Sequence, residues 1–303
     1  MCAPWRLPND AILADSAAKP RSGESAAAYR SPANGPARAV AIGETRRGDG
    51  YNAPQGGVTM SVVRLPGLPR ITEDGPGLAP YLEPTAFLDY ETPAVQRFVR
   101  DAIGDATDAR ERAVRLFYAV RDRIRYDPYR IRYDDAAYHA SRVVEDGYGW
   151  CVSKAGLLAA CARAVGIASA IGLADVVNHL NTEKLRARMG GIDVFYDHGY
   201  AALLLDGHWV KAVPAFNIEL CERFGVRPTD FDGRGDALYQ EHDAHGRLHM
   251  QYLADHGTWS DLPLQQVRDD MARHYPGSAF SAGANEASVA PEDRFENEAP
   301  LGG

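Results

Sequence analysis

Apolar residues recur at helical spacing in three stretches of the chain. Residues 93–103 place apolar side chains three and four positions apart, directly after Thr92, a residue type that often caps a helix. Residues 108–125 repeat the pattern behind Asp108, and residues 152–165 carry it in an Ala- and Leu-rich run. The pattern therefore predicts three helices over these ranges.

A different pattern follows the third helix. Residues 168–174 are mostly apolar and predict a strand, and residues 182–189 predict a short exposed helix. Two apolar runs then flank Asp206-Gly207, a dipeptide typical of a tight hairpin turn. A two-residue turn pairs Leu205 with His208. Helices followed by antiparallel strands indicate an α+β fold.

Both ends of the chain lack this patterning. Residues 1–59 are rich in Ala, Gly, Pro, Ser and Arg, and we interpret them as a disordered tail or as a start site assigned too early, with Met60 as the true start. The segment 278–303 is poor in core-forming residues and is interpreted as a second tail. The folded domain is expected at residues 66–276, which is long enough for one substantial core.

Composition narrows the function classes. The net charge of −8 disfavours a generic nucleic-acid binder, which is more often basic. No run of residues approaches the roughly 20 apolar positions of a membrane span. The N-terminus has no apolar secretory core, so we expect a cytoplasmic protein with no membrane or nucleic-acid partner. Four cysteines without paired CxxC spacing indicate neither a disulfide framework nor a zinc site of that type.

Cys151 is the first candidate for chemistry. It follows Gly147-Tyr-Gly-Trp and opens the predicted helix at residue 152. Free backbone N–H groups and the helix dipole at such a position favour a thiolate and can stabilise an oxyanion. The alternative is a buried core cysteine, which is the usual place of a free thiol. We interpret Cys161 and Cys221 as core residues of that kind.

A nucleophilic thiol needs a base and a residue that orients the base. His198 is the best placed of the nine histidines, because it begins the first hairpin strand. The five histidines between residues 242 and 274 are interpreted as structural or surface residues. In the predicted register, Asn217 lies diagonally beyond the partner of His198, and its side-chain oxygen can accept a hydrogen bond from the imidazole. A Cys151–His198–Asn217 set is sufficient for acyl transfer, and the alternative is that Asn217 caps the next segment.

These motifs resemble the transglutaminase-like cysteine enzyme superfamily. Gly147 to Ile167 is similar to its nucleophile helix, and His198 to Pro214 to its histidine hairpin. The resemblance covers about residues 108–217, and the segment that follows looks like bacterial members with a short extension. It implies a papain-like α+β fold, with the cysteine helix packed on an antiparallel sheet. It also implies Cys–His–Asp chemistry without a metal or other cofactor.

The resemblance carries Cys151 and His198 over directly, but not the third residue. The family has an aspartate four residues after the hairpin tryptophan, and this chain has Val213 there, followed by the expected Pro214. Asn217 is then a substitute, or the enzyme works as a dyad, or it is inactive.

Three functional hypotheses follow. The first is an acyl-transfer enzyme that acts on amide bonds of a peptide or protein through a thioester on Cys151, with hydrolysis favoured over transamidation. The second is an inactive fold that serves as a binding or scaffold protein. The third is a metal site built from Asp193, Asp197 and His198, whose spacing matches no known motif.

Overall fold

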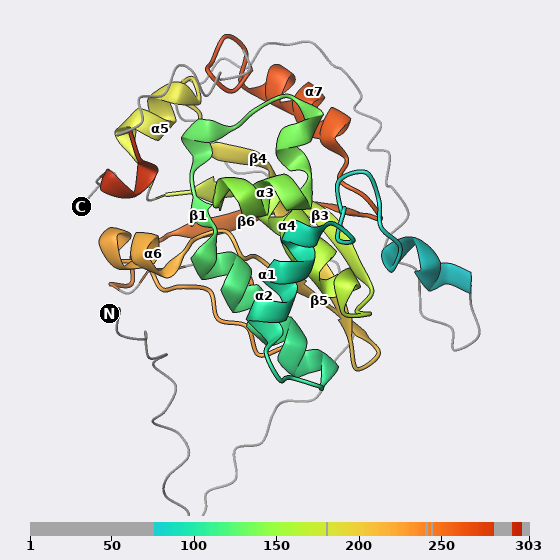
Figure 1. Ribbon diagram of the computed structural model, residues 1–303. Helices are drawn as coiled ribbons and strands as arrows, with labels where there is room; N and C mark the ends of the chain where they lie inside the picture. Colours follow the sequence, from blue (N-terminus) through green and yellow to red (C-terminus); the bar gives the residue numbers. More distant parts are fainter. Residues whose placement is uncertain (1–75, 180, 240–241, 244, 282–292, 299–303) are drawn as a thin grey trace, which may run out of the picture. The chain divides into compact units, whose positions relative to one another are not determined.

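The computed structural model describes residues 76–179, 181–239, 242–243, 245–281 and 293–298 (Figure 1). The predicted tail at residues 1–59, the proposed start at Met60 and most of the predicted tail at 278–303 lie outside these residues. The α-helices are α1 Pro93–Ile103, α2 Ala109–Arg123, α3 Ala140–Asp146, α4 Cys151–Ala164, α5 Glu183–Arg188, α6 Ile218–Phe224 and α7 Leu264–His274. The strands are β1 Arg125–Tyr126, β2 Tyr148–Gly149, β3 Ser169–Asn178, β4 Val194–Leu205, β5 His208–Ala212 and β6 Met250–Trp259.

The main sheet has four strands in the order β5-β4-β3-β6, and every neighbouring pair is antiparallel. A second, two-stranded sheet pairs β1 with β2 in parallel. Because β2 ends two residues before α4 begins, this small sheet fixes the chain immediately ahead of Cys151. The helix-on-antiparallel-sheet arrangement confirms the predicted α+β fold.

Helix α4 is the central element of the described domain. Helices α1, α2 and α3 pack against it on one side, and strands β3 and β4 pack against it on another. Each residue from Cys151 to Arg163 is buried, so the helix needs no polar face. Its Ala- and Gly-rich sequence allows close packing from all sides. Gly199 shows how close: a Cβ on this residue would lie 2.6 Å from the Cα of Val152.

The local predictions agree well with the structure. The three predicted helices are α1, α2 and α4, and Asp108 caps α2 by accepting a hydrogen bond from the Glu111 N–H. The Asp206-Gly207 turn pairs Leu205 with His208, which confirms the predicted register. Cys161 and Cys221 are core residues, as predicted, with exposed fractions of 0% and 1%.

Several elements were not predicted. The strand predicted at 168–174 extends to Asn178, and β6 adds a fourth strand beside it. Helices α3, α6 and α7 are also additional. In the segment interpreted as a C-terminal tail, Phe280 and Phe295 are buried in the core.

Candidate functional site

Cys151 is the first residue of α4, as the sequence indicated. The residue before it, Trp150, is extended, and the Ser153 hydroxyl accepts a hydrogen bond from the Trp150 N–H at 3.0 Å. This hydrogen bond between Trp150 and Ser153 fixes the start of the helix. The backbone N–H groups of Gly199, Val152 and Cys151 itself interact with the Cys151 sulfur. They form the donor set that a thiolate or an oxyanion requires.

Burial nevertheless dominates the protonation state of Cys151. The side chain is buried, and this raises the pKa of its thiol to about 12. The three backbone N–H groups lower the pKa, while the negative charge of Asp197 raises it further. In this conformation the thiol is therefore protonated at neutral pH, and removal of its proton needs a base.

His198 lies on β4 immediately before Gly199, so its backbone is at the start of α4. Tyr126 and Tyr239, which interact electrostatically with Cys151, also lie near the His198 side chain. Its ring packs edge-on against Tyr239, with ring centroids 5.2 Å apart. It lines a narrow cavity together with Tyr126, Phe216 and Phe295. Within the described residues, neither ring nitrogen has a hydrogen-bond partner.

This environment should make folding sensitive to acid. Burial lowers the pKa of His198 from 6.5 to about 3, so the unfolded chain binds a proton that the folded chain does not. The stabilisation is complete above pH 6.5 and is lost as the pH falls toward 3. Between pH 6.5 and about pH 4, we expect the wild type to lose about 3 kcal/mol more unfolding free energy than His198→Gln. Urea titrations across this range measure the difference, and parallel curves would contradict the assignment.

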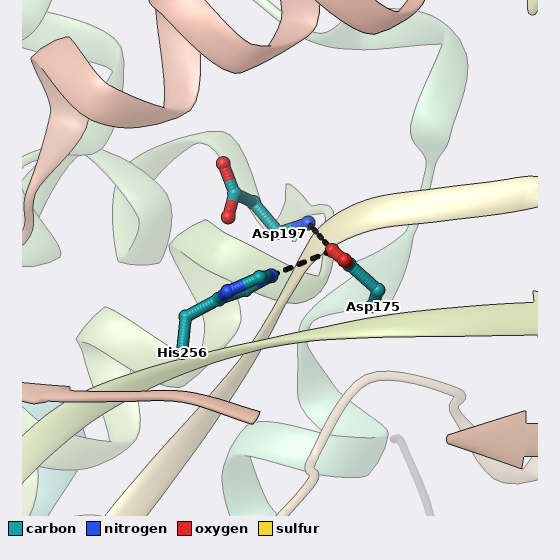
Figure 2. A group of neighbouring side chains, drawn as sticks. All are labelled: Asp175, Asp197 and His256. Atoms are coloured by element: carbon teal, nitrogen blue, oxygen red, sulfur yellow. Dashed lines mark hydrogen bonds and ion pairs between the residues drawn. The ribbon is translucent and has the colours of Figure 1, made fainter. Parts of the chain in front are cut away.

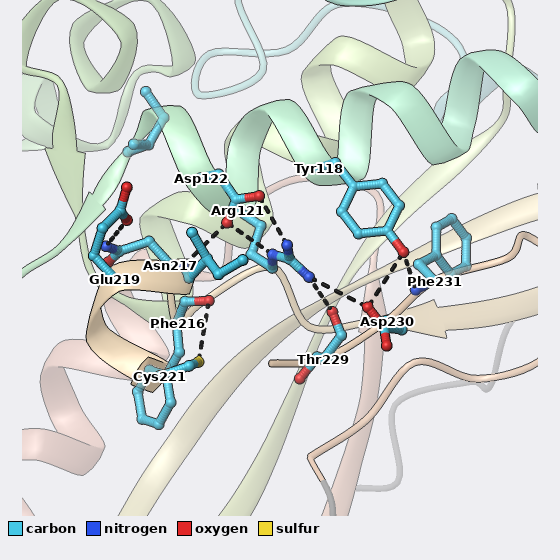
Figure 3. Close-up of polar contacts among 12 residues, drawn as sticks. Tyr118, Arg121, Asp122, Phe216, Asn217, Glu219, Cys221, Thr229, Asp230 and Phe231 are labelled. Carbon is cyan, nitrogen blue, oxygen red and sulfur yellow. Dashed lines mark hydrogen bonds and ion pairs between the residues drawn. The ribbon is translucent and has the colours of Figure 1, made fainter. Parts of the chain in front are cut away.

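Asn217 does not make the predicted contact with His198. It occupies the residue before α6, and its side-chain oxygen accepts a hydrogen bond from the Tyr126 N–H at 3.0 Å. Its side-chain nitrogen donates to Glu219 at 2.8 Å (Figure 3). The side chain therefore joins the segment after β5 to β1, and both of its polar atoms are used in doing so. A catalytic role for Asn217 stays a prediction.

Val213 offers no substitute for the missing acid. It follows β5 directly, it is 1% exposed, and its N–H donates to the Ala237 carbonyl at 2.9 Å. An isopropyl group cannot accept a hydrogen bond from an imidazole. The position of His198 in the hairpin predicts a carboxylate that accepts a hydrogen bond from its ring. Among the described residues, no carboxylate makes this contact.

An unpredicted group of polar side chains lies where β3, β4 and β6 meet (Figure 2). Asp175, Asp197 and His256 each offer one ligand atom within 4.8 Å of the others. Burial raises the pKa of Asp197, and the nearby charge of Asp270 raises it further. A hydrogen bond to Asp175 raises the pKa of His256.

This group includes only Asp197 from the metal set considered in the sequence. Asp193 instead pairs with Arg186 at 2.7 Å, and His198 lines the cavity that it shares with Tyr126 and Phe216. No sequence pattern indicated Asp175 or His256, because 81 positions separate them and neither belongs to a motif.

Comparison with known proteins identifies the domain that carries these residues. Residues 96–214 match the sequence profile of the transglutaminase-like superfamily. The chain has a transglutaminase-like domain. The match includes the start of α4 and the whole β4–β5 hairpin, and so includes both Cys151 and His198. This confirms the resemblance read from the sequence.

Other comparisons add little to the transglutaminase-like assignment. A crystal structure of a protein from Cytophaga hutchinsonii, described as a proposed cysteine protease, aligns with a TM-score of 0.37 and 13% sequence identity. The alignment covers 60% of this chain and 53% of that one, so it spans about half of the other protein. No curated protein matches the chain. In the described part of the chain, no helix has the length and apolar character needed to cross a membrane.

Proposed function

We propose that the transglutaminase-like domain is a thiol-dependent acyl-transfer enzyme that acts on amide bonds of a peptide or protein. The observation that carries the proposal is the position of Cys151 at the first residue of α4, with three backbone N–H groups at its sulfur. Donors at this place are suited to stabilise the negative charge that develops during attack on a carbonyl.

The proposed reaction starts from a neutral thiol. The Cys151 sulfur attacks the amide carbon while His198 accepts the thiol proton, and the backbone N–H groups bind the oxyanion. His198 then protonates the leaving amine, and a thioester remains on Cys151. Water attacks this thioester while His198 takes one of its protons, the C–S bond breaks, and His198 returns the proton to the Cys151 sulfur as the carboxylic acid is released. An amine in place of water would give transamidation.

His198 is in the neutral form that a base requires, although burial also makes it a weaker base than a free imidazole. With its pKa lowered to about 3, the imidazole is uncharged at neutral pH and has a free nitrogen lone pair. The route requires the imidazole to reach the thiol when substrate binds, since no hydrogen bond joins these two side chains in the part of the chain that the structure describes. We propose a Cys151–His198 dyad, with Asn217 holding Tyr126 beside the histidine cavity.

A second candidate function is binding without catalysis. The specific observation in its favour is that the thiol and the imidazole are both neutral, with pKa values of about 12 and about 3, and that Val213 replaces the acid. A domain of this kind would recognise a peptide without cleaving it.

Trapping the thioester distinguishes the two candidates. The protein is incubated with a mixture of short peptides, with and without glutamine, quenched in acid and digested. We expect an acyl adduct on the Cys151 peptide that hydroxylamine removes. In ¹⁸O-labelled water, hydrolysis labels the new carboxyl group, whereas an added primary amine is incorporated if the enzyme transamidates.

The same assay tests the other residues of the proposed site. We expect His198→Ala to lose the adduct and Asn217→Ala to keep it at a reduced level. A folded wild-type protein that gives neither adduct nor product would favour the binding function.

A further inference from the structure

The junction of β3, β4 and β6 brings together side chains from three strands. His256 Nε2 lies 2.8 Å from Asp175 Oδ1, and the Asp197 N–H donates to the same oxygen at 3.2 Å. In Figure 2 the three side chains converge from different strands, and the Asp197 carboxylate lies beside the His256 ring. Asp175 is therefore the common partner of the other two residues.

Two β-bulges create this convergence. Between Ala174 and Val176 of β3, strand β4 contains one extra residue, and Asp197 there adopts a positive φ of 56°. Between Leu173 and Ala174, strand β6 also contains one extra residue, which is His256. A left-handed conformation at an aspartate is uncommon and costs free energy. Strain of this kind is frequent at functional sites, where it aims a side chain.

Asp197 is the residue that points to a ligand. It is 2% exposed, and within the described residues its Oδ2 atom has no partner at full hydrogen-bond distance, with the Asp270 carboxylate as a close neighbour. A buried carboxylate oxygen without a donor is unfavourable, and such groups are normally paired or bound to a metal.

We propose that Asp175, Asp197 and His256 bind one divalent transition-metal ion, with Zn²⁺ as the best fit. Their ligand atoms lie within 4.8 Å of one another, a separation that a single ion about 2 Å from each ligand can bridge after small side-chain movements. One imidazole and two carboxylates suit zinc, whereas Ca²⁺ and Mg²⁺ prefer oxygen ligands alone. Three protein ligands leave a fourth position for water.

The inference does not depend on catalysis at Cys151. A bound ion would join three neighbouring strands at their bulges, and one of these bulges directly precedes His198. The simpler alternative is that His256 and Asp175 form only an ion pair. The pair between His139 and Asp89, at 3.9 Å, provides a comparison because no third metal-binding side chain completes it among the described residues.

Calorimetric titration of the tag-free, chelator-treated full chain tests the proposal. We expect one Zn²⁺ per chain, with a dissociation constant in the micromolar range or tighter. Asp175→Asn keeps an acceptor for the Asp197 N–H but removes the charge, and His256→Gln removes the imidazole. Each should weaken binding at least ~10-fold. His139→Gln and Cys151→Ala should bind as the wild type does.

Two titration results would overturn the metal site. One is a wild-type chain that binds no Zn²⁺. The other is Zn²⁺ binding that survives His256→Gln or disappears in Cys151→Ala, because either outcome would place the ion at another site. A measurement on the wild type alone guards against misfolded variants. Zn²⁺ should protect His256, but not His139, from diethyl pyrocarbonate, as read by peptide mass spectrometry. Equal modification of His256 with and without Zn²⁺ would also reject the proposal.

Discussion

Replacing Cys151 with alanine should lower kcat/KM by at least ~10⁴-fold, because it removes the atom that forms the thioester. The fold should survive, since the start of α4 is fixed by backbone and Ser153 contacts rather than by the sulfur. The measurement is the rate of product formation with the peptides that acylate the wild type. Circular dichroism on the same samples verifies that the variant is folded.

The matched control lies in the same helix. Cys161 is also fully buried in α4, but burial alone raises the pKa of its thiol, and no backbone N–H group interacts with its sulfur in the way seen at Cys151. Cys161→Ala should therefore keep full activity and lose only about 1 kcal/mol of stability from the lost volume. Activity retained in Cys151→Ala would remove this thiol from the mechanism.

Replacing Lys154 with methionine should lower the free energy of unfolding by about 4 kcal/mol. Lys154 is fully buried, and its ammonium donates to the carbonyl oxygens of Arg121, Ile124 and Ala215. Methionine fills a similar volume but leaves all three acceptors without a donor. Two of these acceptors belong to the end of α2, where helix carbonyls lack intrahelical partners.

Urea denaturation measures this loss, with Lys184→Met as the control. Lys184 is 42% exposed and pairs with Asp293 at 2.7 Å, so its replacement should cost less than about 1 kcal/mol. Equal stability of the two variants would show that the buried ammonium does not bind the end of α2 to the segment after β5.

Sequence patterning predicted the elements whose signals are local. Asp108 caps α2, and Asp206-Gly207 sets the hairpin register, because a cap or a two-residue turn acts through bonds within a few residues. The position of Cys151 was predictable for the same reason. Its neighbours Trp150 and Ser153 determine where α4 starts.

Strand β6 was missed because its pattern is irregular. Two register shifts fall within its ten residues, so polar and apolar positions do not alternate. Leu253 is 53% exposed although it is apolar, whereas an alternating strand would direct it to the core. The same irregularity hid His256, whose partners come from other strands.

The side-chain contacts of the candidate site depend on long-range packing. The diagonal position of Asn217 relative to His198 assumed that the strand continues past Ala215. Strand β5 ends at Ala212 instead, and the next residues turn toward β1 to bind the Tyr126 N–H. The Asp206-Gly207 turn predicted the correct register inside the hairpin, but no sequence pattern indicated where the pairing stops.

The bulges of β6 have a consequence for the behaviour of the protein at high concentration. Strand β6 stands at one end of the four-strand sheet, where a regular strand would present a row of free amides and carbonyls to another chain. Two irregularities within ten residues interrupt that row, so a second copy cannot continue the ladder in register. The distortions that direct His256 toward Asp175 thus also protect the sheet from edge-to-edge aggregation.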